Sequence, residues 1–244
     1  MSQASLKERL AKKREEIKKR GGGNSNLIFI KEGTMRIRVL SVGEDEEFAW
    51  EIDQYYLGAE LKGVISPTSI GMDCPIAEKA KELSKSGKDG DTELAKKLIA
   101  RKRWLVPVIL YADDRGKEID HDNSGKMVLI TGGLYGQIID FYLDPDLGDF
   151  MDPQEGYDLK IKRTGKGRTD TEYTVTAMRP SPSDKEYRDE VDLEAMVKEI
   201  IPSYDEAEDI LATFLAGTTD SDDDDEDTGD TGKAPVRKRR RAKA

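Results

Sequence analysis

The chain has 244 residues and carries 40 Lys and Arg against 50 Asp and Glu, for a formal net charge of −10. This length suits one sizeable domain with appendages. No run approaches the roughly 18 apolar residues of a membrane helix, and the basic N-terminus lacks the apolar core of a signal peptide. Cys74 is the only cysteine, which excludes an intramolecular disulfide. We therefore expect a protein of the cytoplasm that associates with no membrane.

The charge is distributed unevenly along the chain. Residues 1–20 have a net charge of +5, residues 217–232 of −8 and residues 233–244 of +7, which leaves −14 for residues 21–216. A net-acidic body does not by itself indicate nucleic-acid binding, because Lys and Arg are the residues that neutralise phosphate groups. A nucleic-acid function therefore has to rest on where the basic residues lie.

The first 23 residues predict a basic helical arm and a linker. Ser5 and Glu8 have the spacing of a capping box, and three glycines at 21–23 end the helix predicted for residues 5–20 with a flexible joint. The apolar residues of this helix form one narrow stripe, namely Leu6, Leu10 and Ile17. So narrow a stripe does not hold a helix on a core, and we expect the arm to become ordered on a partner.

The body begins with two strand patterns and a helical insertion. Residues 35–39 alternate apolar side chains with arginines, as a half-buried strand does, and residues 48–57 form a second strand. Pro75 then suits a first helical turn, and a second helix is predicted for about 92–102.

The second half of the body returns to strands. The strand predicted for residues 104–112 contains Pro107, which indicates a sheet edge or a bulge. Another strand covers 126–130, and a helix runs from Leu134 to Tyr142. Two alternating strands, 157–161 and 173–177, then form a hairpin. Residues 189–216 predict helices broken at Pro202.

This order of elements predicts a mainly β fold with added helices. We expect an OB-fold core, a Greek-key barrel of five to six strands, with flexible charged termini; the pattern equally fits another small mixed β domain. The predicted segments are a basic arm with its linker (1–23), the OB-fold core (24–180), a helical segment (181–216) and a disordered tail (217–244) with an acidic part (217–232) and a basic part (233–244).

The main candidate site is a cluster of positive charge beside a large aromatic ring. Its members are Lys96, Lys97, Arg101, Lys102, Arg103 and Trp104. In a groove that binds single strands, cations follow the phosphates while bases stack on rings, at about 1–3 kcal/mol per base. The same residues also fit an amphipathic helix whose solvated basic face leads into a core tryptophan, and residue types alone leave both interpretations open.

The predicted hairpin is a second candidate. Lys160 and Lys162 share one face of their strand, and the adjoining loop adds Arg163, Lys166 and Arg168. Hairpin loops of this kind flank the groove of an OB barrel. The alternative is an exposed hairpin whose lysine-rich edge prevents aggregation.

Two arginines and four tyrosines make weaker contributions. Arg36 and Arg38 alternate on the first strand, and the rings that could stack on bases are those of Tyr55, Tyr56, Tyr111 and Tyr135. Because Tyr55 and Tyr56 are adjacent, we expect one to point inward and the other outward. For each single tyrosine, core packing is the alternative interpretation.

Metal and catalytic sites are poorly supported, and we expect no cofactor. His121 and Cys74 are the only histidine and cysteine, so one chain cannot assemble a zinc site from them. The aspartates that would suggest a metal-dependent nuclease are Asp144, Asp146, Asp149 and Asp152, but interspersed Pro and Gly make an acidic turn the simpler interpretation. The glycines at 165 and 167 do not form a Walker loop.

Several short segments, in this order and spacing, resemble the single-stranded DNA-binding protein family of T-even phages and other tailed phages. They are Tyr56-Leu57-Gly58, Gly63-Val64-Ile65-Ser66-Pro67, Cys74-Pro75, Arg101-Lys102-Arg103-Trp104, Gly133-Leu134-Tyr135, Glu155-Gly156-Tyr157-Asp158-Leu159 and Thr169-Asp170-Thr171-Glu172-Tyr173. The local similarity covers most of residues 30–215. It implies an OB-fold that binds single-stranded DNA without sequence preference, with Arg101 to Trp104 lining the cleft.

The resemblance also implies partners. The N-terminal arm would drive cooperative binding between neighbouring copies, through Lys12, Lys13, Arg14, Lys18, Lys19 and Arg20. The acidic tail would compete with DNA and recruit phage replication and recombination proteins in the host cytoplasm, through Asp222, Asp223, Asp224, Asp225, Glu226 and Asp227. The alternative is an acidic adaptor or chaperone-like protein that binds basic proteins.

The chain departs from that family's pattern at two points. T-even proteins hold zinc with a Cys-Pro-x-Cys segment, whereas here Ala77 replaces the second cysteine after Cys74, so zinc is not carried over. Those proteins also end in acidic residues, whereas this chain closes with the basic residues 233–244.

Overall fold

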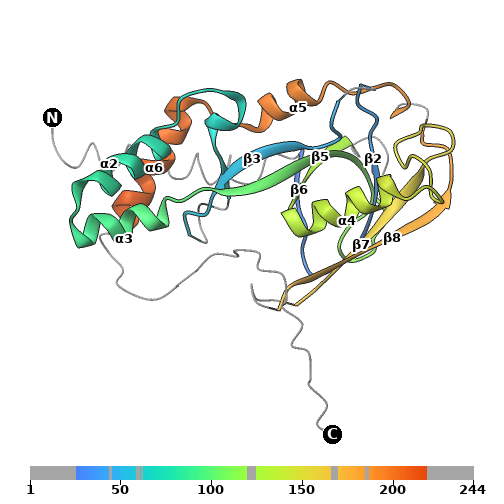
Figure 1. Ribbon diagram of the computed structural model, residues 1–244, viewed down its shortest axis with the longest axis horizontal. Coiled ribbons are helices and arrows are strands. Elements are labelled where there is room, and N and C mark those ends of the chain that lie inside the picture. Colours follow the sequence, from blue (N-terminus) through green and yellow to red (C-terminus); the bar gives the residue numbers. More distant parts are fainter. Residues whose placement is uncertain are drawn as a thin grey trace, which may run out of the picture.

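The computed structural model describes residues 26–43, 46–58, 61, 63–119, 125–165, 170–184 and 187–218. The predicted arm, the predicted tail from residue 219 onward, His121, Lys166 and Arg168 lie outside the described residues, while residues 217 and 218 are helical. Figure 1 shows two regions, with helices grouped at one end and a curved sheet at the other, joined by long strands.

The sheet contains eight strands in the described part of the chain. They are β1 (Leu27–Phe29), β2 (Gly33–Val39), β3 (Trp50–Tyr55), β4 (Val64–Ile65), β5 (Arg101–Ala112), β6 (Gly125–Ile130), β7 (Tyr157–Thr164) and β8 (Glu172–Pro180). The order is β1-β6-β5-β2-β7-β8, with β3 pairing with β4 and with the start of β5. The predicted mainly β fold with added helices is confirmed. The described pairings do not join β1 to β8, so closure into a barrel stays a prediction.

β5 connects the two regions because it changes partner along one edge. Its start pairs with β3, its end pairs with β2, and β6 pairs along the other edge. The sequence predicts a sheet edge or a bulge at Pro107. The structure does not place it at an edge, because it pairs with Met127 of β6 on one side and bonds Leu40 on the other. Its carbonyl accepts a hydrogen bond from the backbone N–H of Leu40 at 2.9 Å, close to the point where β3 gives way to β2. A proline lacks the N–H of a ladder, and this change of partner accommodates the loss.

The helices group into a lobe and two separate elements. α2 (Pro75–Ser86), α3 (Asp89–Lys97) and α6 (Tyr204–Thr218) form what we call the helical lobe, while α4 (Gly132–Leu143) and α5 (Leu193–Ile200) pack on the sheet region. A short 3-10 helix, η1, covers Pro67–Ile70. The predicted first-turn position of Pro75 and the helix break at Pro202 are confirmed.

One predicted helix is shorter than expected. The sequence predicts a helix to about residue 102, but α3 ends at Lys97 and β5 begins at Arg101. Leu98 is buried in the core of the helical lobe, and residues 101–105 pair with β3. Strand pairing and burial override the helical tendency of the lysine-rich run, because local propensity is a weak preference.

Candidate nucleic-acid interface

The four residues at the start of β5 point alternately to the two faces of the sheet. Arg101 and Arg103 share one face, and Lys102 and Trp104 share the other, because successive strand residues alternate. The sequence predicts all four in one groove, with the strand beginning only at Trp104. The earlier start of β5 separates them into two pairs.

Lys102 is partly neutralised by two carboxylates of β3. Its Nζ lies 2.8 Å from Glu51 Oε1 and 3.2 Å from Asp53 Oδ1. The hydrogen bond to Glu51, followed by that to Asp53, raises the pKa of Lys102. The ammonium group is therefore engaged with β3, and its contribution to anion binding is weaker than its residue type predicts.

Trp104 belongs to an aromatic cluster beneath α4. Its indole stacks on the ring of Tyr135, with centroids 5.1 Å apart and an interplanar angle of 18°. It also packs closely on the first residue of α4, since a Cβ on Gly132 would lie 3.1 Å from the indole. Tyr135 covers one face of the indole, so a base has at most the opposite face on which to stack. The core-packing interpretation holds for the covered face.

Phe29 is a half-exposed ring that the sequence reasoning missed. It is 39% exposed at the end of β1. A Cβ on Gly63 would lie 3.5 Å from the Phe29 ring and 2.2 Å from Gln54 Nε2, and Gln54 lies opposite Arg101. The ring therefore lies close to the strand position that faces Arg101. Only an apolar run, residues 27–30, marks this position in the sequence, and such a run indicates core as readily as a binding surface.

The predicted tyrosines differ sharply in exposure. Tyr56 is 61% exposed, whereas Tyr55 and Tyr111 are buried. Burial raises the pKa of both buried phenols to about 12. The prediction that one of the adjacent pair points inward and the other outward is confirmed, and burial removes Tyr55 and Tyr111 as stacking platforms.

Arg38 is a buried structural residue rather than a surface cation. Its guanidinium lies 2.7 Å from Asp158 Oδ1 and donates to the backbone carbonyl of Ser181 at 2.9 Å. Arg36 Nε also lies 3.5 Å from Asp158 Oδ2, and its guanidinium carbon is 4.9 Å from the centroid of the Tyr111 ring. Arg38 is buried because it pairs with a carboxylate that is far away in sequence. The alternation of residues within one strand does not reveal such a pairing.

The β7 hairpin presents two lysines to solvent. Lys160 and Lys162 are exposed and share one face, opposite Thr176 and Thr174 of β8. Arg163 instead donates through Nη1 to the backbone carbonyl of Ile30 at 2.6 Å. Arg163 therefore ties β7 to the chain before β2, which corrects its predicted place among the loop cations.

Most of the chain matches a known family. Residues 31–213, more than half of the chain, match the family described as gp32 DNA binding protein like. The chain belongs to this family. The resemblance drawn from the sequence is thereby confirmed, and the gp32-like domain has a DNA-binding role. No curated protein matches the chain.

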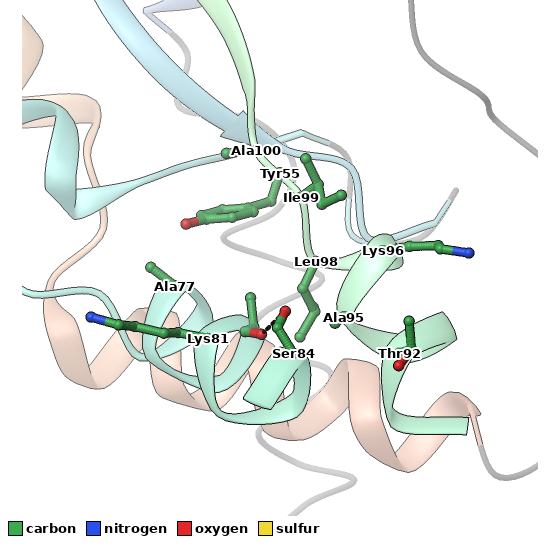
Figure 2. A pocket seen from close by; sticks show the side chains of 11 residues that line it. Tyr55, Ala77, Lys81, Ser84, Thr92, Ala95, Lys96, Leu98, Ile99 and Ala100 are labelled. Carbon is green, nitrogen blue, oxygen red and sulfur yellow. Dashed lines mark hydrogen bonds between the residues drawn. The ribbon is translucent and has the colours of Figure 1, made fainter. Parts of the chain in front are cut away.

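The helical lobe of this gp32-like chain contains a hollow of about 380 Å³. We call it the basic hollow, because its only charged lining residues are Lys81 and Lys96. In Figure 2 these lysines lie on opposite sides, with Tyr55 and Leu98 between them. The lining residues are Tyr55, Ala77, Ala80, Lys81, Ser84, Thr92, Ala95, Lys96, Leu98, Ile99 and Ala100.

A second hollow, of about 510 Å³, lies beside the N-terminal end of β3. We call it the acidic hollow, because five of its eight lining residues are carboxylates and none is basic. The lining residues are Glu46, Glu47, Ala49, Trp50, Glu51, Asp192, Leu193 and Glu194. Like charges repel, so this part of the gp32-like domain disfavours phosphate groups.

The acidic segment after α4 consists of turns. Asp144, Asp149 and Asp152 each accept backbone N–H groups through their carboxylates. The hydrogen bond from the backbone of Glu155, followed by that from Gln154, lowers the pKa of Asp152. Within the described ranges, no three His, Cys, Asp or Glu side chains are grouped to hold a metal ion. None of the helices described is long and apolar enough to span a membrane.

Proposed function

We propose that this protein binds single-stranded DNA without sequence preference, on a surface that begins at Arg101 and Arg103. One observation carries the proposal, namely the convergence of charge and ring at the start of β5. Two arginines share one face there, the basic end of α3 lies a short turn before them in the chain, and the Phe29 ring lies close to the position opposite Arg101. Phosphates follow the cations while a base stacks on the ring.

A preference for unpaired DNA follows from the stacking. A base inside a duplex already has both faces covered by its neighbours, whereas an unpaired base can offer one face to the Phe29 ring. Stacking is tolerant of sequence because every base has a π-face. The exposed lysines of β7 lie level with the other end of β5, because Lys160 pairs with Arg36 and Arg36 pairs with Ala112. They therefore do not belong to the surface at Arg101.

The role that we propose is to coat and protect single strands during phage replication, recombination and repair, in the cytoplasm of the infected host and without catalysis. Basic residues of the arm would contact neighbouring copies along the strand. If so, removing residues 1–20 weakens clustering on long strands more than affinity for a short oligonucleotide. Equal losses in the two binding assays would contradict a cooperative arm.

The acidic tail would regulate access to the strand and recruit replication proteins. Residues 217–232 carry a net charge of −8 on a tether, which gives a high effective concentration beside basic residues. Deleting 217–232 alone should tighten binding to oligo-dT at low salt. No tightening would contradict competition between tail and DNA.

The experiment that tests the function is a titration of the full chain with single-stranded and duplex DNA of equal length at two salt concentrations. We expect tighter binding to the single strand and a slope of about −0.7 in log affinity against log salt for each phosphate contacted. Equal affinity for duplex would contradict the proposed preference. Absence of binding to both would favour the adaptor hypothesis, in which the acidic segments bind basic proteins.

A further inference from the structure

We infer that the basic hollow receives one base of the bound strand, an inference that rests on the proposed single-stranded DNA binding. The hollow is an open space bordered by α2, α3 and the turn into β5, and its volume of about 380 Å³ lies in the range of small-ligand sites. Space remains there because four of its lining residues are alanines, namely Ala77, Ala80, Ala95 and Ala100.

The walls suit a flat and mostly apolar group. Leu98 and the Tyr55 ring line the hollow, and Ile99, which is 62% exposed, stands beside them. Ser84 Oγ donates to the carbonyl of Ala80 at 2.8 Å, and Thr92 Oγ1 donates to the carbonyl of Lys88 at 3.0 Å. Each hydroxyl oxygen therefore keeps a lone pair that can accept an N–H from the edge of a base.

The charges around the hollow favour a group that is attached to phosphates. Lys81 and Lys96 are both exposed lysines on its rim, and no carboxylate lines it. Lys96 pairs with Glu93 at 2.7 Å, but a pair between exposed side chains contributes little and exchanges readily for another anion. A neutral apolar peptide would leave both lysines without a role.

The hollow adjoins the start of β5, where the proposed interface begins. Ala100, one of its lining residues, directly precedes Arg101 in the chain, and consecutive Cα atoms lie about 3.8 Å apart. A strand whose phosphates meet Arg101 can therefore turn its next base toward the hollow. Residues 219–232 of the acidic tail contain no apolar side chain that could fill this space.

The test combines a filled hollow with abasic DNA. Each position of a short oligo-dT is replaced in turn by an abasic site, and affinities are measured for the full-length wild type and for Ala80→Leu. In the wild type, we expect some positions to cost about fivefold or more in affinity, as lost stacking does. In Ala80→Leu, an abasic site at one of those positions should no longer lower the affinity, while abasic sites at the other positions should lower it as in the wild type.

Two further variants secure the interpretation. Ala212→Leu adds the same side chain at an exposed position of α6 and should keep the complete wild-type profile. Thr92→Leu fills the hollow from α3 and replaces Ala80→Leu where thermal unfolding shows the latter to be unfolded. Binding with an unchanged abasic profile in the filled variant overturns this inference alone. A wild type that binds no oligonucleotide overturns the proposed function itself.

Discussion

The basic and acidic hollows stand at opposite ends of one short strand and have opposite charge. Tyr55, the last residue of β3, lines the basic hollow, and Trp50, the first, lines the acidic hollow. The two ends are separated by about 17 Å at 3.3 Å per residue. The net charge of −10 for the whole chain therefore does not describe the local charge at either end of β3. Local arrangement decides where a polyanion can bind, and the total charge of the chain does not.

Glu51 lies at the boundary between the two regions. It lines the acidic hollow, and its carboxylate also pairs with Lys102 at the start of β5. A carboxylate of the acidic hollow thus pairs with Lys102, one of the cations that the sequence predicts in the DNA-binding groove. The contrast between the hollows can be tested by removing cations or rings on the basic side and by removing carboxylates on the acidic side.

The largest expected effect is that of reversing the cations at the start of β5. Arg101→Glu with Arg103→Glu should weaken single-strand affinity about thirtyfold or more at low salt. Loss of two phosphate contacts should also flatten the salt slope by about 1.4. Arg115→Glu with Lys117→Glu makes the same charge change at two exposed positions beyond the far end of β5 and is the matched control. Equal losses in both double variants would mean that total charge governs binding.

The next effect concerns the ring beside the arginines. Phe29→Ala should lower single-strand affinity about fivefold or more because a stacking platform is lost. The salt slope should stay unchanged, since the ring carries no charge. Tyr142→Ala, which removes another exposed ring at the end of α4, is the control and should have little effect on affinity. A changed slope in Phe29→Ala would indicate that the cations have moved.

A smaller gain is expected from releasing Lys102. Glu51→Gln with Asp53→Asn removes both carboxylates that pair with its ammonium group. Affinity for a single strand should rise about threefold, in keeping with the modest strength of exposed ion pairs. Asp146→Asn with Glu155→Gln removes the same charge at exposed positions after α4. A gain of equal size in that control would rule out a specific effect on Lys102.

The smallest effect concerns the wall of the basic hollow at high pH. Burial raises the pKa of Tyr55 from 10.0 to about 12, so the folded chain holds the phenol proton more tightly than the unfolded chain. Stability should be unaffected below pH 10 and should fall as the pH rises from 10 towards 12. Tyr55→Phe should make this fall in the unfolding midpoint less steep, while Tyr111 continues to contribute its own share. An identical pH profile in the variant would contradict the burial of this hydroxyl.

The sequence pattern predicts several elements correctly because they depend on residues that are close together in the chain. The β7–β8 hairpin alternates apolar and polar residues, α4 repeats its apolar residues at helical spacing, and Pro202 separates α5 from α6. Alternation is also why Lys160 and Lys162 were expected on one face. Each of these features depends on residues a few positions apart, which the sequence displays directly.

The sequence predictions that the structure corrects share a different cause. Arg38 is buried against Asp158, 120 residues away, and Phe29 lies beside Gly63, close to the β3 residue Gln54 that pairs with Arg101. α3 ends at Lys97 because the residues that follow, from Arg101, pair with β3 as a strand. No periodicity within one segment records which distant segment will pack on it.

By itself, the sequence determined the family, the mainly β class with added helices and the concentration of cations before Trp104. Those properties depend on residue types and short spacings. Only the tertiary structure decided which cations are engaged by carboxylates, which rings remain open and that the two hollows differ in charge. Burial and pairing are properties of neighbours in space, and long-range strand pairing is what makes these residues neighbours.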